Sequence, residues 1–232
     1  MIPGWKGSVF PFVTPPPPPD PGPLYLAVGQ AFGATSALVD MDVGASHADR
    51  FVIATIGCIR RGGGTGHITA LTIGGVAATL LASNYAATYD GAYVFGAALP
   101  TGSTATLVPT ISSGGPNHFS VQLYRCVGLA STTPADTSGI GGSEISLNVP
   151  DGGFALYVHH RNNYATKEPA MFGVTGGGDI DYTTQIYATA TAIGHANIHL
   201  SVMPLGGDPS FTSEEDGTAG YAGYRHCGVA ML

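Results

Sequence analysis

Charge is scarce in this sequence, and positive charge is the scarcest. The 232 residues include 8 Lys and Arg against 15 Asp and Glu, which gives a formal net charge of −7 at pH 7. Proteins that bind nucleic acid or an anionic membrane neutralise phosphates with clustered Lys and Arg. Because this chain has too few cations for such a surface, we expect neither nucleic acid nor a membrane among its partners.

Long apolar runs are also missing. No run approaches the roughly 20 residues that a helix needs to cross a bilayer. The first residues, MIPGWKGSVFPFV, have no charged segment followed by an unbroken apolar one, as a secretory leader would. We therefore expect a soluble chain without a signal peptide, made in the cytoplasm.

Cysteine is rare and shows no paired spacing. Cys58, Cys126 and Cys227 each lie in an apolar run, and no C-x-x-C motif occurs. A free Cys behaves as a small apolar side chain. We predict three buried thiols, with a disulfide between two of them as the alternative.

What is present favours strands over helices. Lys, Glu, Gln and Arg, which fill exposed helix faces, are few, while the chain holds 35 Gly and 17 Pro. Val, Ile, Thr, Tyr and Phe occupy the stretches between turn signals, which return about every ten residues after Leu24. We predict an all-β fold: a single domain over residues 24–232, a two-sheet antiparallel sandwich, jelly-roll-like, preceded by an extended proline-rich arm over residues 1–23.

Runs of strand-forming residues give thirteen expected strands. They are Leu24–Phe32, Arg50–Ile59, His67–Ile73, Val76–Ser83, Ala92–Leu99, Thr104–Ile111, Phe119–Val127, Glu144–Val149, Gly153–His160, Ala170–Val174, Tyr182–Ile193, Ala196–Met203 and Gly223–Met231. Gly74 and Gly75 predict a two-residue hairpin turn, because Gly tolerates the positive φ angles of such turns. Residues 150–153 predict a tight reversal. The polar stretches 130–143 and 205–221 are expected to be loops.

A proline run near the start of the chain predicts a rigid spacer. The stretch TPPPPPDPGP, residues 14–23, cannot form a helix or a central strand and should adopt polyproline II, about 3.1 Å per residue. The spacer residues are Pro15, Pro16, Pro17, Pro18 and Pro19. The aromatic residues before it, Trp5, Phe10 and Phe12, stand in a segment too short to bury them. We predict that these aromatics anchor the chain on a partner protein.

Other interpretations of the arm stay open at this point. It could fold back over an edge of its own sandwich, or it could be disordered. The prolines also match the PxxP pattern of ligands for SH3-like modules, but no Arg or Lys flanks them.

Eight histidines raise the question of a metal site. His195 and His199 lie about 13 Å apart along an extended strand, which is too far to share one zinc. His159 and His160 are adjacent and should point to opposite faces, as should His226 and Cys227. We therefore predict no metal site and no cofactor.

The acidic residues do not match a known calcium or catalytic pattern. Asp40 with Asp42, Asp179 with Asp181, and the group Glu214, Glu215 and Asp216 lie in turn-like segments without EF-hand spacing. No G-x-S-x-G motif occurs, and the Gly-rich RRGGGTG lacks the Lys-Ser/Thr ending of a phosphate loop. We predict a protein that is not an enzyme; a glycan hydrolase using the 214–216 acids is the alternative.

Several blocks of the sequence resemble a known class of proteins. The blocks DRFVIATIG (49–57), ITALTIGGVAATLL, FGAALPTGSTATLVPTIS (95–112), FSVQLYRCVGL (119–129) and GGFALYVHH (152–160), in this order, are similar to β-sandwich virion structural proteins of tailed bacteriophages and gene transfer agents. The resemblance is a pattern of strands and glycines over most of residues 24–232.

This resemblance implies a subunit on the surface of a virion. It would be a capsid decoration or a head-fibre or spike subunit, with other capsid or tail proteins as partners and with self-association as a further expectation. The alternative is a tail-fibre or baseplate module that binds a host surface glycan. Exposed aromatics would then stack on the sugar; the candidates are Tyr85, Tyr89, Tyr164 and Tyr221.

Overall fold

The structure is a computed structural model that describes residues 24–34, 37–59, 66–85, 90–112, 118–140, 144–163, 173–174, 179–187, 194–202, 210–212 and 223–232. Every regular element in these ranges is a β-strand, and every pairing between strands is antiparallel. Within them, no helix has the length and apolar character needed to span a membrane. The all-β antiparallel prediction is confirmed.

In the described residues, the N-terminal half of the fold contains nine strands in two sheets. Sheet A has the order β1-β9-β3-β7-β6, and sheet B has the order β2-β8-β4-β5. The strands are β1 (Leu24–Ala34), β2 (Leu38–Asp42), β3 (Phe51–Ile59), β4 (Ile68–Ile73), β5 (Val76–Ala77), β6 (Thr79–Tyr85), β7 (Asp90–Ala98), β8 (Thr104–Ile111) and β9 (His118–Val127).

The described part of the C-terminal half contains eight strands, again in two sheets. Sheet C has the order β10-β17-β12-β15-β14, and sheet D has the order β11-β16-β13. The strands are β10 (Asp136–Ile140), β11 (Glu144–Ser146), β12 (Phe154–Asn163), β13 (Gly173–Val174), β14 (Asp179–Tyr187), β15 (Gly194–Val202), β16 (Ser210–Thr212) and β17 (Gly223–Met231). The last strand, β17, pairs with β10 on one side and β12 on the other and so lies inside sheet C.

The two halves repeat one strand order. If β1 to β4 correspond to β10 to β13, and β6 to β9 correspond to β14 to β17, then sheet A and sheet C have identical orders. Sheet D then repeats the β2-β8-β4 order of sheet B, and among the strands in the described residues only β5 has no counterpart. Each pairing in the C-terminal half therefore has an equivalent pairing in the N-terminal half.

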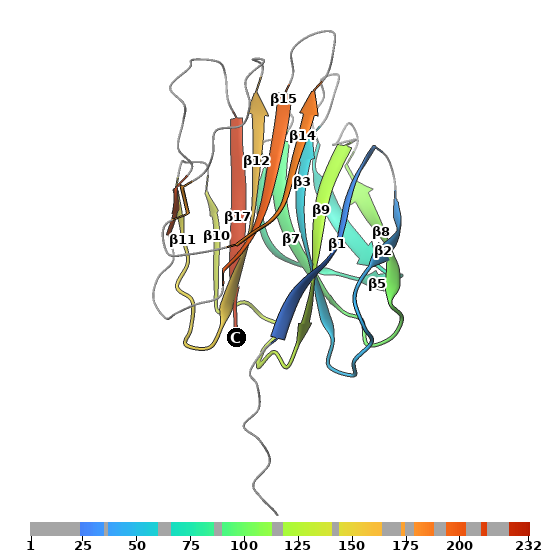
Figure 1. The fold of residues 1–232 in the computed structure, drawn as a ribbon. Helices are drawn as coiled ribbons and strands as arrows, with labels where there is room; N and C mark the ends of the chain where they lie inside the picture. The colour runs from blue at the N-terminus through green and yellow to red at the C-terminus, as the bar shows by residue number, and fades with distance from the viewer. Residues whose placement is uncertain are drawn as a thin grey trace, which may run out of the picture.

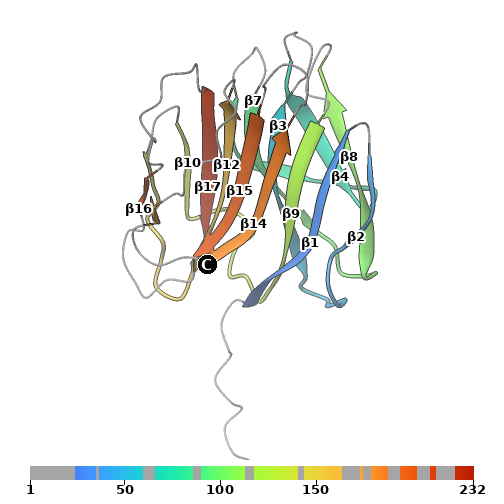
Figure 2. The ribbon, with the colours of Figure 1, turned by 45° about the horizontal axis from the view of Figure 1, so that its top comes forward.

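Sheet A is buried on both faces, which follows from the alternation of its side chains. In β3, Val52, Ala54 and Ile56 pack with residues of sheet B in one apolar cluster. Phe51 and Ile53, which point the opposite way, pack with residues of sheet C in a second cluster. Figure 1 shows β12, β15 and β14 passing in front of β3 and β7, and in Figure 2 sheets C and B lie on either side of β9 and β1.

The second apolar cluster forms the contact between the halves, and we call it the shared layer. It contains Phe51, Ile53, Ala82, Ala92, Val94, Tyr124 and Cys126 from the N-terminal half, and Phe154, Leu156, Val158, Cys227, Val229 and Met231 from the C-terminal half. All of them are buried. The prediction of a single domain over residues 24–232 depends on this layer and stays a prediction.

Two predicted turns form as expected. Gly74 and Gly75, with φ angles of 59° and 80°, join β4 to β5, and Ile73 pairs with Val76 on either side of them. Positive φ at both central positions is the requirement of a primed turn, which explains the two glycines. At the second site, the Gly153 amide donates to the Pro150 carbonyl at 2.9 Å and closes the reversal before β12.

The structure differs from the prediction in the number of strands and sheets. Four sheets are present in the described residues instead of two. Strands β2, β10 and β16 occupy segments that we expected to be loops or left unassigned. β2 carries Asp40 and Asp42, and β10 has the sequence DTSGI; both are edge strands, which need fewer apolar residues because one side of the strand is unpaired.

A buried arginine closes one corner of the N-terminal half. Arg50 is 1% exposed, and its guanidinium donates to the carbonyl of Gly44 at 2.7 Å, to that of Thr101 at 2.6 Å and to that of Leu99. Burial, and secondarily the charge of Arg125, lower the pKa of Arg50. The carbonyl oxygens replace the water that this cation gives up on burial, which holds the loop before β3 against the loop after β7.

Candidate functional site

The residues predicted to anchor the protein lie outside the described part of the chain. These residues are Trp5, Phe10 and Phe12, together with the spacer Pro15 to Pro19. The same applies to Tyr89, Tyr164, Tyr221, Glu214, Glu215 and Asp216. The first described residue, Leu24, opens β1, an edge strand of sheet A, and lies opposite Val127 of β9.

The acids that the structure describes act locally. Asp40 and Asp42 are exposed, and a carboxylate oxygen of Asp42 accepts the Gly44 amide at 2.7 Å. Asp136 accepts the amides of Thr137 and Asn148, each at 2.8 Å, and so ties β10 to the segment after β11. Asp40 and Asp42, which we expected in a turn, lie in strand β2, and the Asp42 carboxylate stabilises the segment that follows this strand.

Tyr85 is the one candidate sugar-binding aromatic among the described side chains. It is exposed, but its ring stacks on His67 with a centroid distance of 4.4 Å. Tyr85 also stacks on Tyr93 at 5.9 Å, and Tyr93 stacks on Phe95 at 6.1 Å, so the row of rings continues into the core. Burial raises the pKa of the Tyr93 hydroxyl, which accepts the Ile68 amide at 3.3 Å. The row therefore anchors Tyr85 to the core. The His67 ring covers one face of the Tyr85 ring, on which a sugar could otherwise stack.

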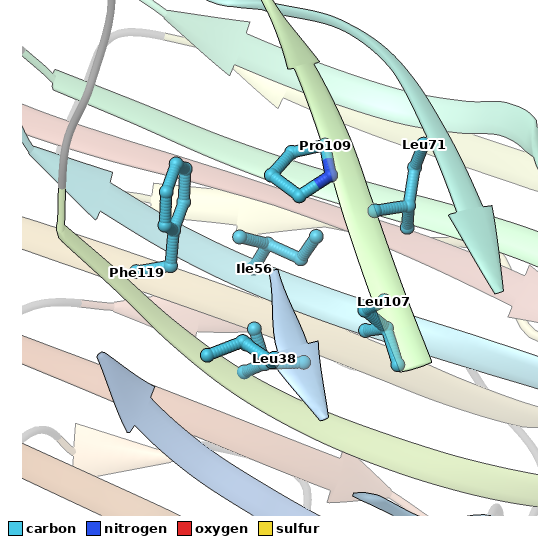
Figure 3. Close-up of a pocket in the computed structure, with 7 residues that line it drawn as sticks. Leu38, Ile56, Leu71, Leu107, Pro109 and Phe119 are labelled. Atoms are coloured by element: carbon cyan, nitrogen blue, oxygen red, sulfur yellow. The ribbon is translucent and has the colours of Figure 1, made fainter. Parts of the chain in front are cut away.

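A small apolar pocket lies between sheets A and B. It is lined by Leu38, Ile56, Leu71, Leu107, Pro109, Phe119 and Val121, and it has an empty volume of about 230 Å³, open solvent included. Figure 3 shows the side chains of β2, β3, β4, β8 and β9 that surround it. Sites for small molecules usually measure roughly 300 to 1,000 Å³ and include a few polar groups. This pocket is smaller and entirely apolar, so its shape and lining suit core packing.

All three cysteines are free and buried, which confirms the prediction of buried thiols. Burial raises the pKa of Cys126 and of Cys227. Because the thiolate is the reactive form, these thiols are poor nucleophiles in the folded protein.

One end of the shared layer is polar. Thr55, Ser120 and Gln122 of sheet A and His160 of sheet C are each no more than 2% exposed. Strand alternation places them on the faces that the two sheets turn toward each other. The Thr55 hydroxyl donates to the Gln122 carbonyl at 3.3 Å, and the Asn84 side chain donates across the two halves to the His226 carbonyl at 3.2 Å. Buried polar groups of this kind determine the orientation in which two surfaces pack more than they add to the free energy of packing.

Two histidines that are far apart in the sequence meet inside the C-terminal half. His159 of β12 lies directly opposite His226 of β17, on the face turned away from sheet A. Their Nδ1 atoms are 3.3 Å apart, their ring centroids are 5.4 Å apart, and the side chains are 6% and 4% exposed. Sequence reasoning considered neighbours along one strand and so missed a pair created by strand register. A His within an apolar strand run was the available signal.

Within the described residues, His, Cys, Asp and Glu do not form a group of three that could hold a metal ion. His195 and His199 lie in β15 and are paired with different positions of β12, Asn162 and Val158. Comparison of the chain with protein-family models, curated proteins and solved structures found no match.

Proposed function

We propose that this protein is a non-enzymatic structural protein on the surface of a tailed-phage particle. It would be a capsid decoration or a head-fibre or spike subunit, made in the host cytoplasm and docked onto capsid or tail proteins by Trp5, Phe10 and Phe12. A tail-fibre or baseplate module that binds a host glycan is the alternative form of the same proposal.

The observation that carries this proposal is the repeated strand order. In the N-terminal half the chain alternates between sheets A and B along β1, β2, β3 and β4, and β1-β9-β3-β7 packs against β2-β8-β4-β5. This is the order that two Greek keys give when they roll into a jelly roll, so we propose a jelly roll for each half. Jelly rolls recur in viral capsid and lectin domains. The support is an analogy of fold, because one fold can serve many functions.

The position of the first strand also supports the arm as an anchor. β1 is an edge strand, and its first residue, Leu24, lies at the end of the sheet where β9 ends. A chain that enters there can leave the layers without crossing either covered face of sheet A. The proline spacer would extend about 30 Å over ten residues, far enough to separate an anchored segment from the sheets.

The test is assembly of particles with altered arms. We expect a chain lacking residues 1–23 to keep its strand signal in circular dichroism and to lose incorporation into density-purified particles by at least tenfold. The triple variant Trp5→Ala/Phe10→Ala/Phe12→Ala should reproduce that loss with the spacer intact. Normal incorporation of both proteins would contradict the proposal. Loss of the strand signal in circular dichroism would indicate that residues 1–23 are needed for folding instead of docking.

A further inference from the structure

The outer face of sheet B, which we call the B face, is turned away from the rest of the molecule. Leu71 of β4 and Leu107 of β8 are buried against sheet A, so strand alternation turns the residues next to them outward. The outward side chains are Val39, Ala70, Thr72, Ala77, Thr106, Val108 and Thr110. Val39 is 67% exposed and Val108 is 41% exposed. Figure 2 shows β2, β4 and β8 on the side opposite sheet C.

Charge is missing from most of this face. Strands β4, β5 and β8 contain no Asp, Glu, Lys or Arg, although such residues make up roughly a quarter of a typical globular chain. The acids of sheet B, Asp40 and Asp42, lie in its edge strand β2. The hydroxyl of the exposed Thr69 donates to the Thr110 carbonyl at 3.1 Å and would keep this partner if the face were covered. A surface of β-branched side chains without charge has the composition of an interface core.

The charge of the whole chain favours a second copy of this chain as the occupant. Each copy has a formal net charge of −7, so two copies repel each other least where they meet through uncharged surfaces. A partner that was recognised by its charge would need charged groups on the face, and β4, β5 and β8 offer none. The B face is therefore suited to pack on an identical, equally neutral face.

The strand order indicates how two copies would lie. Because sheet B has the order β2-β8-β4-β5, a two-fold axis parallel to the strands places β8 of one copy over β4 of the other, and β2 over β5. The β2 acids of the two copies then lie at opposite rims, about 14 Å apart across three strand spacings. This separation exceeds the Debye length of about 8 Å at physiological ionic strength.

The size of the face sets the strength of the contact. Four strands about 4.8 Å apart and about 20 Å long cover roughly 400 Å² per copy. A stable interface usually buries about 800 Å² per partner, so this contact belongs to the weak, transient class. We propose that the B face is a self-docking surface, which binds the B face of a second copy weakly and places β8 over β4 of that copy.

The experiment is sedimentation equilibrium of the full chain from micromolar to millimolar concentration. We expect the average mass to rise from that of one chain toward that of two. Val108→Lys, near the centre of the face, should weaken association at least tenfold, although the added Lys makes the net charge less negative. Thr137→Lys, at an exposed position of β10, is the matched control and should change association less than twofold. Circular dichroism checks that both variants are folded.

Two results of this experiment would overturn the proposal. One is a chain that stays monomeric at every concentration, which would leave the B face to a different protein. The other is association that Val108→Lys does not weaken. The proposal does not depend on docking by Trp5, Phe10 and Phe12, because the experiment contains no particle. The variant Trp5→Ala/Phe10→Ala/Phe12→Ala should associate as the unmodified chain does, and loss of association there would assign the contact to the arm and also overturn the proposal.

Salt dependence tests the same contact without any variant. Added salt screens the repulsion between two negative chains and leaves apolar contacts in place. We expect association of the unmodified chain to stay constant or to tighten when sodium chloride is raised tenfold. A contact made by opposite charges would weaken instead, and weakening by more than threefold would overturn the proposal.

Disulfide cross-linking tests the arrangement of the two copies. Thr72 and Val108 lie opposite each other within one copy, so the two-fold axis places Val108 of one copy over Thr72 of the second. A mixture of the Val108→Cys chain and the Thr72→Cys chain should therefore form a mixed disulfide faster than either chain links to itself. The three native thiols are buried and should not compete. Faster linking of either chain to itself would overturn the proposed arrangement.

Discussion

In the N-terminal half Ile56 faces Val121 across two strands, whereas in the C-terminal half the corresponding partners, counted from the first residues of β3 and β12, are His159 and His226. A second pair inverts its sizes: Ala54 faces Leu123 in one half, and Tyr157 faces Gly228 in the other. A Cβ at Gly228 would lie 2.7 Å from the Tyr157 ring, so the glycine makes room for that ring. The same strand order therefore forms with large and small side chains exchanged across a strand pair, and with polar side chains in place of apolar ones.

Among the side chains that face the other half, corresponding residues are more alike near the first residues of β3 and β12 than farther along these strands. Phe51 corresponds to Phe154, Ile53 to Leu156, and Cys126 to Met231, and all of them lie in the shared layer. Farther along, Thr55 and Gln122 correspond to Val158 and Cys227, so even this layer changes from polar to apolar. The comparison teaches that strand order is set by the alternation of inward positions, while the chemistry at each position is free to differ between halves.

The largest expected effect comes from removing the Arg50 hydrogen bonds, which hold the loop before β3 against the loop after β7 in the N-terminal half. Arg50 corresponds to Gly153, the residue before Phe154, and Arg50→Met removes the donors of four buried or part-buried carbonyls, those of Val43, Gly44, Leu99 and Thr101. We expect a loss of about 4 kcal/mol in the free energy of unfolding, measured in urea. Arg125→Met is the control: Arg125 donates to Ala45 at 2.8 Å at an exposed site, and about 1 kcal/mol or less should be lost. Equal losses would contradict the role of the corner.

The next effect tests the equivalence of the two phenylalanines. Phe51→Ala and Phe154→Ala each remove a buried ring from the shared layer, and each should cost about 3 kcal/mol in urea unfolding. Because both rings belong to one cluster, the double variant should depart from additivity by more than about 0.5 kcal/mol. Val39→Ala, at a residue that is 67% exposed, should change stability by less than about 0.5 kcal/mol. Strict additivity would indicate that the two rings do not share a layer.

A smaller loss of stability is expected at the pair formed by Tyr157 and Gly228. Gly228→Ala forces a methyl group against the Tyr157 ring and the Leu156 carbonyl, and should cost about 2 kcal/mol. In the background of Tyr157→Ala, the same change should cost less than half as much, because the ring is gone. Thermal unfolding of the four proteins of this cycle gives the comparison. An unchanged cost would mean that the backbone contact alone is responsible.

The smallest expected effect is a decrease in the free energy of unfolding at alkaline pH. Burial raises the pKa of Cys126 and Cys227, so their thiols stay protonated in the folded protein, whereas in the unfolded chain they ionise near pH 8.5. Above that pH the unfolded chain therefore holds fewer protons, and stability falls as the pH rises. Urea midpoints between pH 7.5 and 9.5 should show this fall, and Cys126→Ala/Cys227→Ala should reduce its slope. A slope that the double variant leaves unchanged would assign the fall to other groups.

Much of the fold was predictable because it depends on local patterns. Alternating apolar runs gave β3, β7, β8, β9 and β17 to within a few residues, and the Gly74–Gly75 turn followed from backbone sterics. The edge strands β2 and β10 were missed because they are short and polar. The repeat of strand order was not visible, since corresponding positions such as Ile56 and His159 share no chemistry. The His159–His226 pair depends on register between strands that are 67 residues apart, which no local pattern encodes.

The comparison of the halves depends on strand pairing, and cross-strand amide contacts measured by NMR on the perdeuterated full chain test it most directly. We predict contacts of β17 with both β10 and β12, and of β9 with both β1 and β3, so that the two halves show the same pattern. Pairing of β17 or β12 with a strand of the N-terminal half would contradict the account, because the two halves would then form one continuous sheet instead of two repeated ones.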